Sequence, residues 1–131
     1  MRVLDTDVCV EILRGNPRVL QRRLQTLDQV ATSWVTAAEL FYGAAKSARP
    51  EQMSAAVRAF LATLGVLGID DRSAAHFGRL KVGLEASGLR LANADLLIAS
   101  IGLAHGATIA TGNIRHYDRV PELSVEDWIR G

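Results

Sequence analysis

Residues 2–8, Arg-Val-Leu-Asp-Thr-Asp-Val, form a short apolar run that ends abruptly in two carboxylates, Asp5 and Asp7. In domains that alternate strands and helices, ligands bind at the carboxyl ends of the strands, where the chain turns into a loop. This position predicts a functional site at Asp5. A second interpretation stays open, because Asp is also a favoured N-cap and either carboxylate could simply begin the following helix.

Length and composition exclude several classes of protein. The 131 residues suit one domain that buries its own core, and 49% hydrophobic with 22% charged residues describes a folded chain. No apolar run approaches the ~18 residues of a membrane span, and no export signal is apparent, so we expect a cytoplasmic protein that does not enter a membrane. Cys9 is the single cysteine. It excludes an internal disulfide and a cysteine-based zinc site, and we expect it to be buried.

Arginine dominates the cations, because Lys46 and Lys81 are the only lysines among fifteen basic residues. The planar guanidinium suits phosphate recognition. A genome rich in G and C would produce the same bias, and the formal net charge is only +1. Charge alone therefore does not indicate a nucleic-acid-binding protein.

Apolar runs and chain breakers predict alternating strands and helices. Strands are expected at 3–4, 29–35, 66–69, 107–111 and 123–125. Helices are expected at 8–14, 18–27, from 36 onward, at about 50–64, from 71 or 73 to about 87, and at 93–104, with a helical turn at 114–118. This alternation predicts an α/β fold formed by a single domain, residues 1–131, in which helices cover both faces of a parallel sheet.

Glu39 lies in the stretch 36–43, Thr-Ala-Ala-Glu-Leu-Phe-Tyr-Gly, which follows a predicted strand. Thr36 and Glu39 match the capping box, in which the Thr caps a helix and the Glu reaches back to the cap residue. The same Glu39 also lies at a strand-to-helix junction, where ligands bind. Both interpretations remain open at this point.

Asp95 lies in the first turn of an unusually apolar predicted helix. We expect Asn93 to cap this helix, and no charged residue follows between Leu96 and Ala104. A helix that is apolar all round is buried. Asp95 is then a carboxylate at the end of a buried element, and we expect the helix N-terminus to hold it ionised.

Asp5, Glu39, Asp95 and the loop Gly112–Asn113 all fall at carboxyl ends of strands or at the helix starts beyond them. Three carboxylates that converge there need a cation. Hard oxygen ligands without Cys or His favour Mg²⁺ or Mn²⁺. Such a site suits phosphodiester hydrolysis, because the metal activates a water and neutralises charge on the phosphate oxygens.

Four blocks of this sequence, taken together, closely resemble the PIN-domain family, and within it the VapC-type toxins of bacterial toxin-antitoxin pairs. The blocks are LDT at 4–6, TAAELFYG at 36–43, NADLLIAS at 93–100 and TGNIRHYDRV at 111–120. The resemblance implies a PIN-like parallel sheet of about five strands flanked by helices, and a Mg²⁺-dependent endoribonuclease that a partner antitoxin neutralises. It also matches Asp5, Glu39 and Asp95 to the family's acidic metal-binding and catalytic positions.

The chain departs from the family pattern at two positions. Asp7 stands where the family more often has Asn, and Asn113 occupies the region where many members carry a fourth acid. Both are further candidate metal ligands, so one or two ions remain possible. Arg115 and Arg119 follow the same loop and are candidate contacts to RNA phosphate, with ion pairs to Asp118 or Glu122 as the alternative.

The resemblance also implies partners. We expect RNA as substrate, an antitoxin that silences the protein by occupying the acidic site, and a homodimer. Trp34, Phe41 and Tyr42 could form a hydrophobic groove or a dimer face, although core packing is the default for each of them.

Two other functions compete with the nuclease. Asp5 and Asp7 also match the two carboxylates of haloacid-dehalogenase-like phosphatases, but that scheme needs a Lys and an acidic motif late in the chain, and no Lys follows Lys81. The other alternative is a catalytically silent binding domain. Such a domain would tolerate Asp5→Asn with little loss of metal-dependent behaviour.

Overall fold

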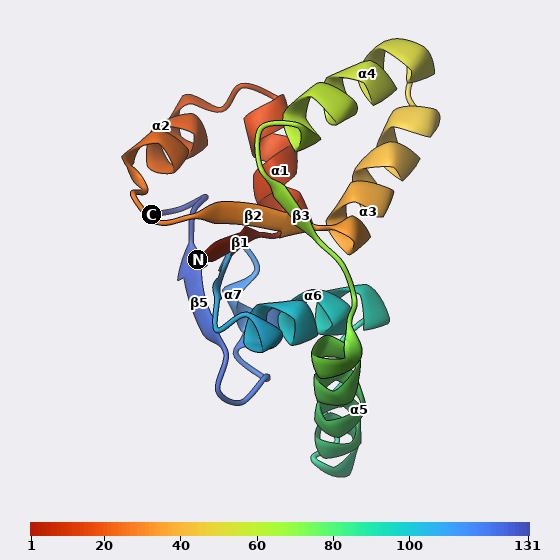
Figure 1. The fold of residues 1–131 in the computed structure, drawn as a ribbon, viewed down its shortest axis with the longest axis vertical. Coiled ribbons are helices and arrows are strands. Elements are labelled where there is room, and N and C mark those ends of the chain that lie inside the picture. Colours follow the sequence, from red (N-terminus) through yellow and green to blue (C-terminus); the bar gives the residue numbers. More distant parts are fainter.

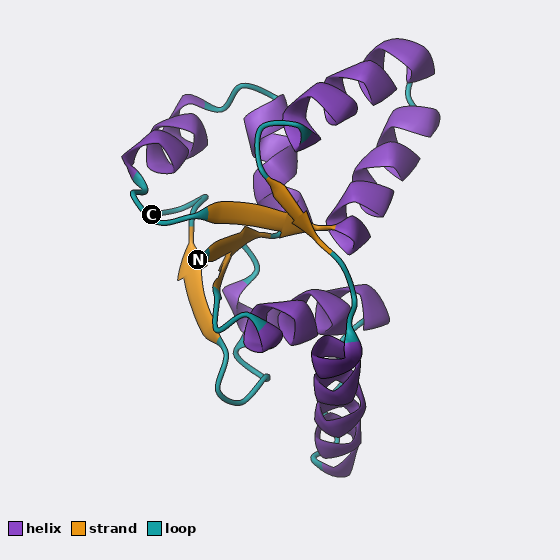
Figure 2. Ribbon diagram, viewed as in Figure 1, coloured by secondary structure: helices purple, strands orange, loops and turns teal.

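Five parallel strands form one sheet in the computed structural model, which describes all 131 residues. The strand order is β3-β2-β1-β4-β5, so the strand that ends in Asp5 is central (Figures 1 and 2). The predicted parallel sheet of about five strands is confirmed. Its strands are β1 (Arg2–Leu4), β2 (Val30–Ser33), β3 (Gly65–Leu67), β4 (Thr108–Thr111) and β5 (Ser124–Asp127).

Helices cover both faces of the sheet (Figure 1). Side chains alternate along a strand, so Val3 and Ile109 enter one core while Leu4 and Ala110 enter the other. One face carries α1 (Thr6–Leu13), α2 (Pro17–Gln25), α3 (Trp34–Ala45) and α4 (Pro50–Leu61). The opposite face carries α5 (Asp71–Ala86), α6 (Asn93–Ala104) and α7 (Ile114–Tyr117).

The apolar helix α6 is buried against the sheet, as its sequence predicts. Gly102 permits the close approach, since a Cβ there would lie 2.7 Å from Cδ1 of Ile109 on β4. This packing holds the first turn of α6, with Asp95, near the acids of α1 and α3. No helix in the structure is both long enough and apolar enough to span a membrane.

Of the two open interpretations of Glu39, the capping box with Thr36 is wrong. The strand expected at 29–35 ends at Ser33, and α3 already begins at Trp34. Ser33 is the N-cap, because its Oγ accepts the N–H of Thr36 at 3.1 Å. Glu39 is therefore free of any role at the start of its own helix.

The cap predicted for α6 is also wrong. Ala92 occupies the N-cap position, and no side chain there accepts a helix N–H. Asn93 is the first helical residue, and its Oδ1 instead accepts a hydrogen bond from Nζ of Lys81 at 3.1 Å. The amide side chain thus ties α6 to α5 and does not cap its own helix.

Other differences concern the ends of elements. The strand expected at 66–69 is Gly65–Leu67, and the strand expected at 123–125 is Ser124–Asp127, paired with β4 along its whole length. Trp34 and Tyr42 are 57% and 66% exposed, so core packing is wrong for both of them. Phe41 packs against the core, and Cys9 is buried as predicted.

Candidate active site

Asp5 lies at the carboxyl end of the central strand and is only 4% exposed. Its Oδ1 accepts the N–H of Thr6 at 2.9 Å, so Asp5 is the N-cap of α1. Its Oδ2 accepts a hydrogen bond from Oγ1 of Thr111, at the end of neighbouring β4, at 2.8 Å. The N-cap interpretation of Asp5 is therefore confirmed, and the same carboxylate also joins two strand ends. Its role in a functional site stays a prediction.

Asp7, in the first turn of α1, is hydrogen-bonded to the loop that follows β4. Its Oδ2 accepts the N–H of Gly112 at 2.9 Å, and its Oδ1 lies 3.4 Å from Oγ1 of Thr111. A Cβ at position 112 would lie 2.9 Å from that Oδ2 and 2.7 Å from Cδ1 of Ile129. Glycine is required there because the backbone and the carboxylate approach so closely.

Glu39 projects from α3 toward the end of β1. Its Oε1 accepts a hydrogen bond from Oγ1 of Thr6 at 2.6 Å, and the same Thr6 oxygen lies 3.1 Å from Oγ1 of Thr36. Since one hydroxyl carries one proton, Thr6 donates to Glu39 and accepts from Thr36. Thr6 thus links the carboxylate of α3 to the N-terminus of α1, where Asp5 lies.

Asp95 approaches the other acids from α6. Its Oδ2 lies 3.6 Å from Nδ1 of His116, a half-exposed residue on α7. Burial raises the pKa of Asp95, His116 lowers it, and the charges of Glu39 and Asp7 raise it again. Burial is the largest of these influences, so the pKa of Asp95 lies above its ordinary value.

The four carboxylates share a region without a compensating Lys or Arg. Burial, and after it the charge of Asp7, raise the pKa of Asp5 to about 6, against the lowering effect of the hydrogen bonds from Thr111 and Thr6. Burial also raises the pKa of Asp7. Apart from His116 with Asp95, these acids form no ion pair in the structure. The region carries excess negative charge, which a cation would relieve.

The residues present fit a hard divalent cation in donor type. Every candidate ligand is an oxygen, as Mg²⁺ and Mn²⁺ prefer. No group of three Asp, Glu, His or Cys side chains is already gathered at metal-ligand spacing. Carboxylates repel one another, so a bound cation would favour their closer approach. A buried hydroxyl without a partner, that of Tyr117, lies beside the same acids.

A hollow of about 510 Å³ opens beside the acids. Arg115 and Arg130 both line it, and Arg130 is held in place because its Nη1 donates to the Gly112 carbonyl at 2.6 Å. Arg115 is exposed and forms no ion pair, so the predicted alternative of a salt bridge to Asp118 or Glu122 is wrong. The remaining lining residues are Gly112, Asn113, Ile114, His116 and Asp127.

Arg119 lies apart from this hollow. Its Nη1 donates to the backbone carbonyl of Arg90 at 2.5 Å, and it lines a different depression with Arg79 and Pro121. The two arginines that the sequence grouped together are therefore separated in space. Their contact with RNA stays a prediction, and the structure favours Arg115 for it.

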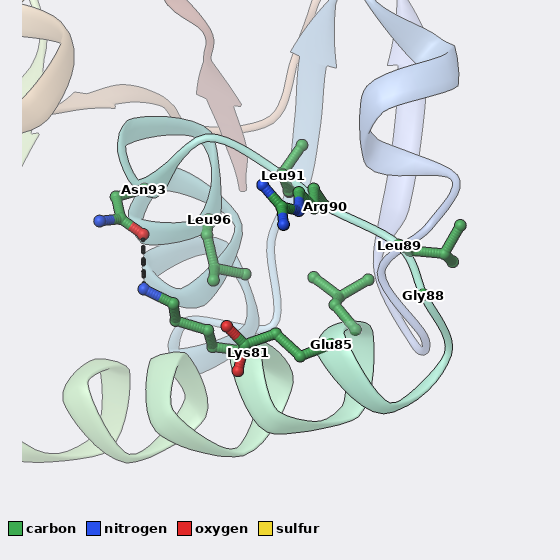
Figure 3. A pocket seen from close by; sticks show the side chains of 9 residues that line it. Lys81, Glu85, Gly88, Leu89, Arg90, Leu91, Asn93 and Leu96 are labelled. Carbon is green, nitrogen blue, oxygen red and sulfur yellow. Dashed lines mark hydrogen bonds between the residues drawn. The ribbon is translucent and has the colours of Figure 1, made fainter.

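Another hollow, of about 620 Å³, lies between the end of α5 and the start of α6 (Figure 3). The Lys81–Asn93 hydrogen bond bounds it on one side, and the side chain of Leu96 lines it. Asn93 and Asp95 are two residues apart, so they point to opposite sides of α6. This hollow therefore lies on the side of α6 away from the acids, and it contains none of them.

Sequence reasoning missed three residues of the site: Thr6, Thr111 and His116. Thr6 stands between the two acids of the motif, and Thr111 is the last strand residue before Gly112, so both positions carried a signal. Position alone did not indicate their hydrogen bonds to Glu39 and Asp5. For His116 the sequence offers no signal, because its proximity to Asp95 depends on how α7 packs against α6.

Comparison with known proteins gives a consistent result. The model of the PIN domain family matches residues 2–123. Ribonuclease VapC2 of Rickettsia felis is 36% identical, with 96% of each chain covered, and the tRNA(fMet)-specific endonuclease VapC of Salmonella typhimurium is 32% identical, again with 96% of each covered. The crystal structure of DNA-bound VapBC from Salmonella typhimurium superposes with a TM-score of 0.91 at 32% identity, covering 97% of each chain.

These matches extend over nearly the whole chain and include the segments that carry Asp5, Glu39 and Asp95. VapC nucleases with a PIN domain generally depend on a divalent metal ion. The parallel sheet, the acids at its carboxyl edge and the matched relatives agree. The chain belongs to the PIN-domain family and, within it, to the VapC ribonucleases.

Proposed function

We propose that this chain is a divalent-metal-dependent endoribonuclease and the toxin of a toxin-antitoxin pair. The observation that carries the proposal is the state of Asp5. This carboxylate is buried at the end of the central strand, and its pKa is raised to about 6 beside other uncompensated acids. Carboxylates with such perturbed pKa values cluster at functional sites. Oxygen ligands of this kind suit the binding of a divalent cation, which supports phosphodiester hydrolysis.

Asp5, Glu39 and Asp95 would hold the ion, which we propose to be Mg²⁺ or Mn²⁺. Asp7 is a weaker ligand candidate, because its Oδ2 is already engaged by the N–H of Gly112. Asn113 is exposed and its side chain makes no hydrogen bond, so it suits contact through a water or with a phosphate. A bound ion would activate a water for attack on phosphorus.

The protein's own residues supply orientation and charge. Thr111 and the N–H of Thr6 hold both oxygens of Asp5, and the Thr6 hydroxyl holds Glu39. Arg115 lines the adjacent hollow without an ion-pair partner, so its guanidinium is free to contact RNA phosphate. We place the scissile phosphate between these acids and that hollow, where Arg115 would offset the growing negative charge. Arg119 contributes less, because its guanidinium is hydrogen-bonded to the backbone carbonyl of Arg90.

The partners follow from the relatives. Solved structures from Rickettsia felis and Salmonella typhimurium, with TM-scores of 0.89 and 0.91, are VapBC complexes bound to DNA. We propose that this chain likewise has an antitoxin, that its RNA substrate includes tRNA, and that it acts in the cytoplasm. We also propose a homodimer, for which the exposed Trp34 and Tyr42 are candidate contacts.

The phosphatase alternative fits the structure poorly. It would require Asp7 to exchange protons with a substrate, but both of its oxygens face Thr111 and Gly112. It also leaves Glu39 and Asp95 without a role. Relatives that match nearly the whole chain are named ribonuclease or endonuclease, which favours the nuclease over a silent binding domain as well.

The direct test is incubation of the purified protein with total RNA and, separately, with purified tRNA, in Mg²⁺, in Mn²⁺ and in EDTA. We expect discrete cleavage products with either ion and intact RNA in EDTA. Cleavage that persists in EDTA would remove the metal from the proposal. Intact RNA in all three conditions, from a protein shown to be folded, would remove the nuclease.

The toxin role needs its own experiment. Induction of the chain alone in a bacterial host should arrest growth, whereas induction of the Asp5→Ala protein should not. Co-expression of the cognate antitoxin should restore growth. Equal growth in the first two cultures, with both proteins present at the same level in the soluble fraction, would remove the toxin role and leave the nuclease untouched.

A further inference from the structure

Tyr117 is the one buried residue of the structure whose side-chain polar atom has no hydrogen-bond partner. The residue is the last of α7, is fully buried, and packs its ring into the same core as Leu96 of α6. A buried hydroxyl without a partner is destabilising, and native proteins seldom keep one without a function. If only packing of the ring mattered, Phe would pack equally well and would bury no unpartnered hydroxyl.

The hydroxyl of Tyr117 lies beside the acids of the site. Burial raises its pKa above the ordinary value, and the charges of Asp5, Asp95 and Asp7 raise it further. The hydroxyl approaches Asp5 closely enough for the two groups to interact, but no acceptor lies within hydrogen-bonding geometry. It therefore stays protonated at any physiological pH and is a donor that faces carboxylates.

Asp5 has acceptor capacity left for such a donor. An ionised carboxylate offers about four lone-pair sites. The N–H of Thr6 occupies one on Oδ1 and the hydroxyl of Thr111 occupies one on Oδ2. One further site on each oxygen remains, which is enough for a cation on one and a hydroxyl donor on the other.

We propose that Tyr117 is a positioning residue of the metal site, whose hydroxyl donates to Asp5 when a divalent cation is bound there and holds that carboxylate in its ligating orientation. The inference rests on the metal-dependent function proposed above. Partners of this kind, which hold a metal ligand in place, typically change metal affinity by about 10- to 100-fold. The Tyr117 hydroxyl would thus lack a hydrogen-bond partner in the metal-free protein and gain one, Asp5, in the metal-bound protein.

The test compares Tyr117→Phe with Tyr42→Phe, which removes the hydroxyl of the 66% exposed tyrosine. Mg²⁺ and Mn²⁺ affinities are measured by calorimetry, and melting temperatures in EDTA and in saturating Mg²⁺. For Tyr117→Phe we expect an unchanged or higher melting temperature in EDTA, a Kd for the ions about ten-fold weaker, and a smaller stabilisation by Mg²⁺. Tyr42→Phe should match the wild type in ion affinity and in the stabilisation that Mg²⁺ adds, because the Tyr42 hydroxyl is exposed and makes no hydrogen bond to the acids.

A second readout uses wild-type protein labelled with ¹³C at the phenolic carbon of tyrosine. Tyr42→Phe assigns the two signals, and the Tyr117 signal should move on Mg²⁺ addition while the Tyr42 signal stays. Unchanged ion affinity in Tyr117→Phe, or an equal loss of stability with and without Mg²⁺, would overturn the inference and leave Tyr117 as core packing. Wild-type protein that binds neither ion would instead overturn the metal site itself.

Discussion

The hydroxyl of Thr111 donates a hydrogen bond to Oδ2 of Asp5 at 2.8 Å, joining the carboxyl ends of two adjacent strands across 106 residues of sequence. Oγ1 of Thr111 also accepts the N–H of Asn113 at 2.9 Å. Thr111 is fully buried, so neither bond can be replaced by bulk water. One threonine thus orients the central carboxylate and shapes the loop that borders the site.

Thr111→Val should therefore damage stability and activity together. The substitution keeps the shape of the side chain but leaves the N–H of Asn113 and one lone pair of Asp5 without partners, at a cost of about 1–3 kcal/mol in the free energy of unfolding. Urea unfolding measures this loss, and the cleavage rate of RNA should fall as well. Thr111→Ser keeps the hydroxyl and should recover most of both, whereas equal behaviour of the two variants would show that the methyl group, and not the hydrogen bond, matters.

Asp5→Asn should stabilise the metal-free protein near neutral pH while abolishing activity. The pKa of Asp5 is raised to about 6 in the folded state from an ordinary value of 3.8, so folding binds a proton between these values. The stability contributed by protonated Asp5 is fully present below about pH 4 and is lost as the pH rises through 6. At pH 7 in EDTA the variant should be more stable by up to about 3 kcal/mol.

The measurement is urea unfolding of both proteins in EDTA from pH 4 to 8, with the difference between them plotted against pH. Asp28→Asn is the control, because the pKa of that exposed carboxyl is shifted in the opposite direction: the N-terminal ammonium lowers it. The stability of this variant relative to the wild type should fall only as the pH rises through values below about 4, so between pH 5 and 8 its difference from the wild type should stay constant while that of Asp5→Asn changes. A difference between Asp5→Asn and wild type that does not vary with pH would contradict the electrostatic account of Asp5.

Glu39→Gln and Ser33→Ala should have complementary effects. Ser33 caps α3, so its loss should lower the free energy of unfolding by about 1 kcal/mol and leave the acids in place. Glu39 is exposed and takes no part in that cap, so Glu39→Gln should leave stability within about 0.5 kcal/mol and strongly reduce both ion binding and RNA cleavage. Thermal unfolding and calorimetry with Mn²⁺ separate the two roles. A Glu39→Gln protein that binds Mn²⁺ normally would remove Glu39 from the site.

Arg115→Ala should slow RNA cleavage without lowering the melting temperature. The side chain is exposed, forms no ion pair and lines the hollow beside the acids, so stability does not depend on it. Arg119→Ala is the matched comparison, because Arg119 lies elsewhere and bonds to the carbonyl of Arg90. Cleavage should respond to Arg115→Ala more than to Arg119→Ala, and the reverse order would place the RNA on the other side of α7.

Much of the fold was predictable because the sheet is parallel and buried on both faces, so each strand reads as an apolar run and each helix follows a recognisable break. Element ends were less predictable. Trp34 and Val35 are residues typical of strands, yet they lie in α3, because Ser33 caps the helix before them. A local cap overrode the intrinsic preference of the two residues that follow it.

The proximity of the acids of the candidate site was predictable from position, since carboxyl ends of parallel strands meet at one edge. Their electrostatics were not. Asp95 lies in the first turn of a helix, which suggests a lowered pKa, but its burial depends on how α6 packs against the sheet and this raises the pKa instead. The environments of His116 and Tyr117 likewise arise only when α7 folds back beside α6, a contact that no local pattern records.

The most direct test of the account is the cleavage rate of Asp95→Asn on RNA in saturating Mg²⁺, measured beside the wild type, with circular dichroism to show that both are folded. Asn keeps the size of the half-buried side chain and removes the charge that the ion would need. We predict a fall of at least about 100-fold, which corresponds to about 3 kcal/mol of lost transition-state stabilisation. A folded Asp95→Asn protein that cuts RNA at the wild-type rate would contradict the claim that Asp5, Glu39 and Asp95 form one metal-dependent catalytic site.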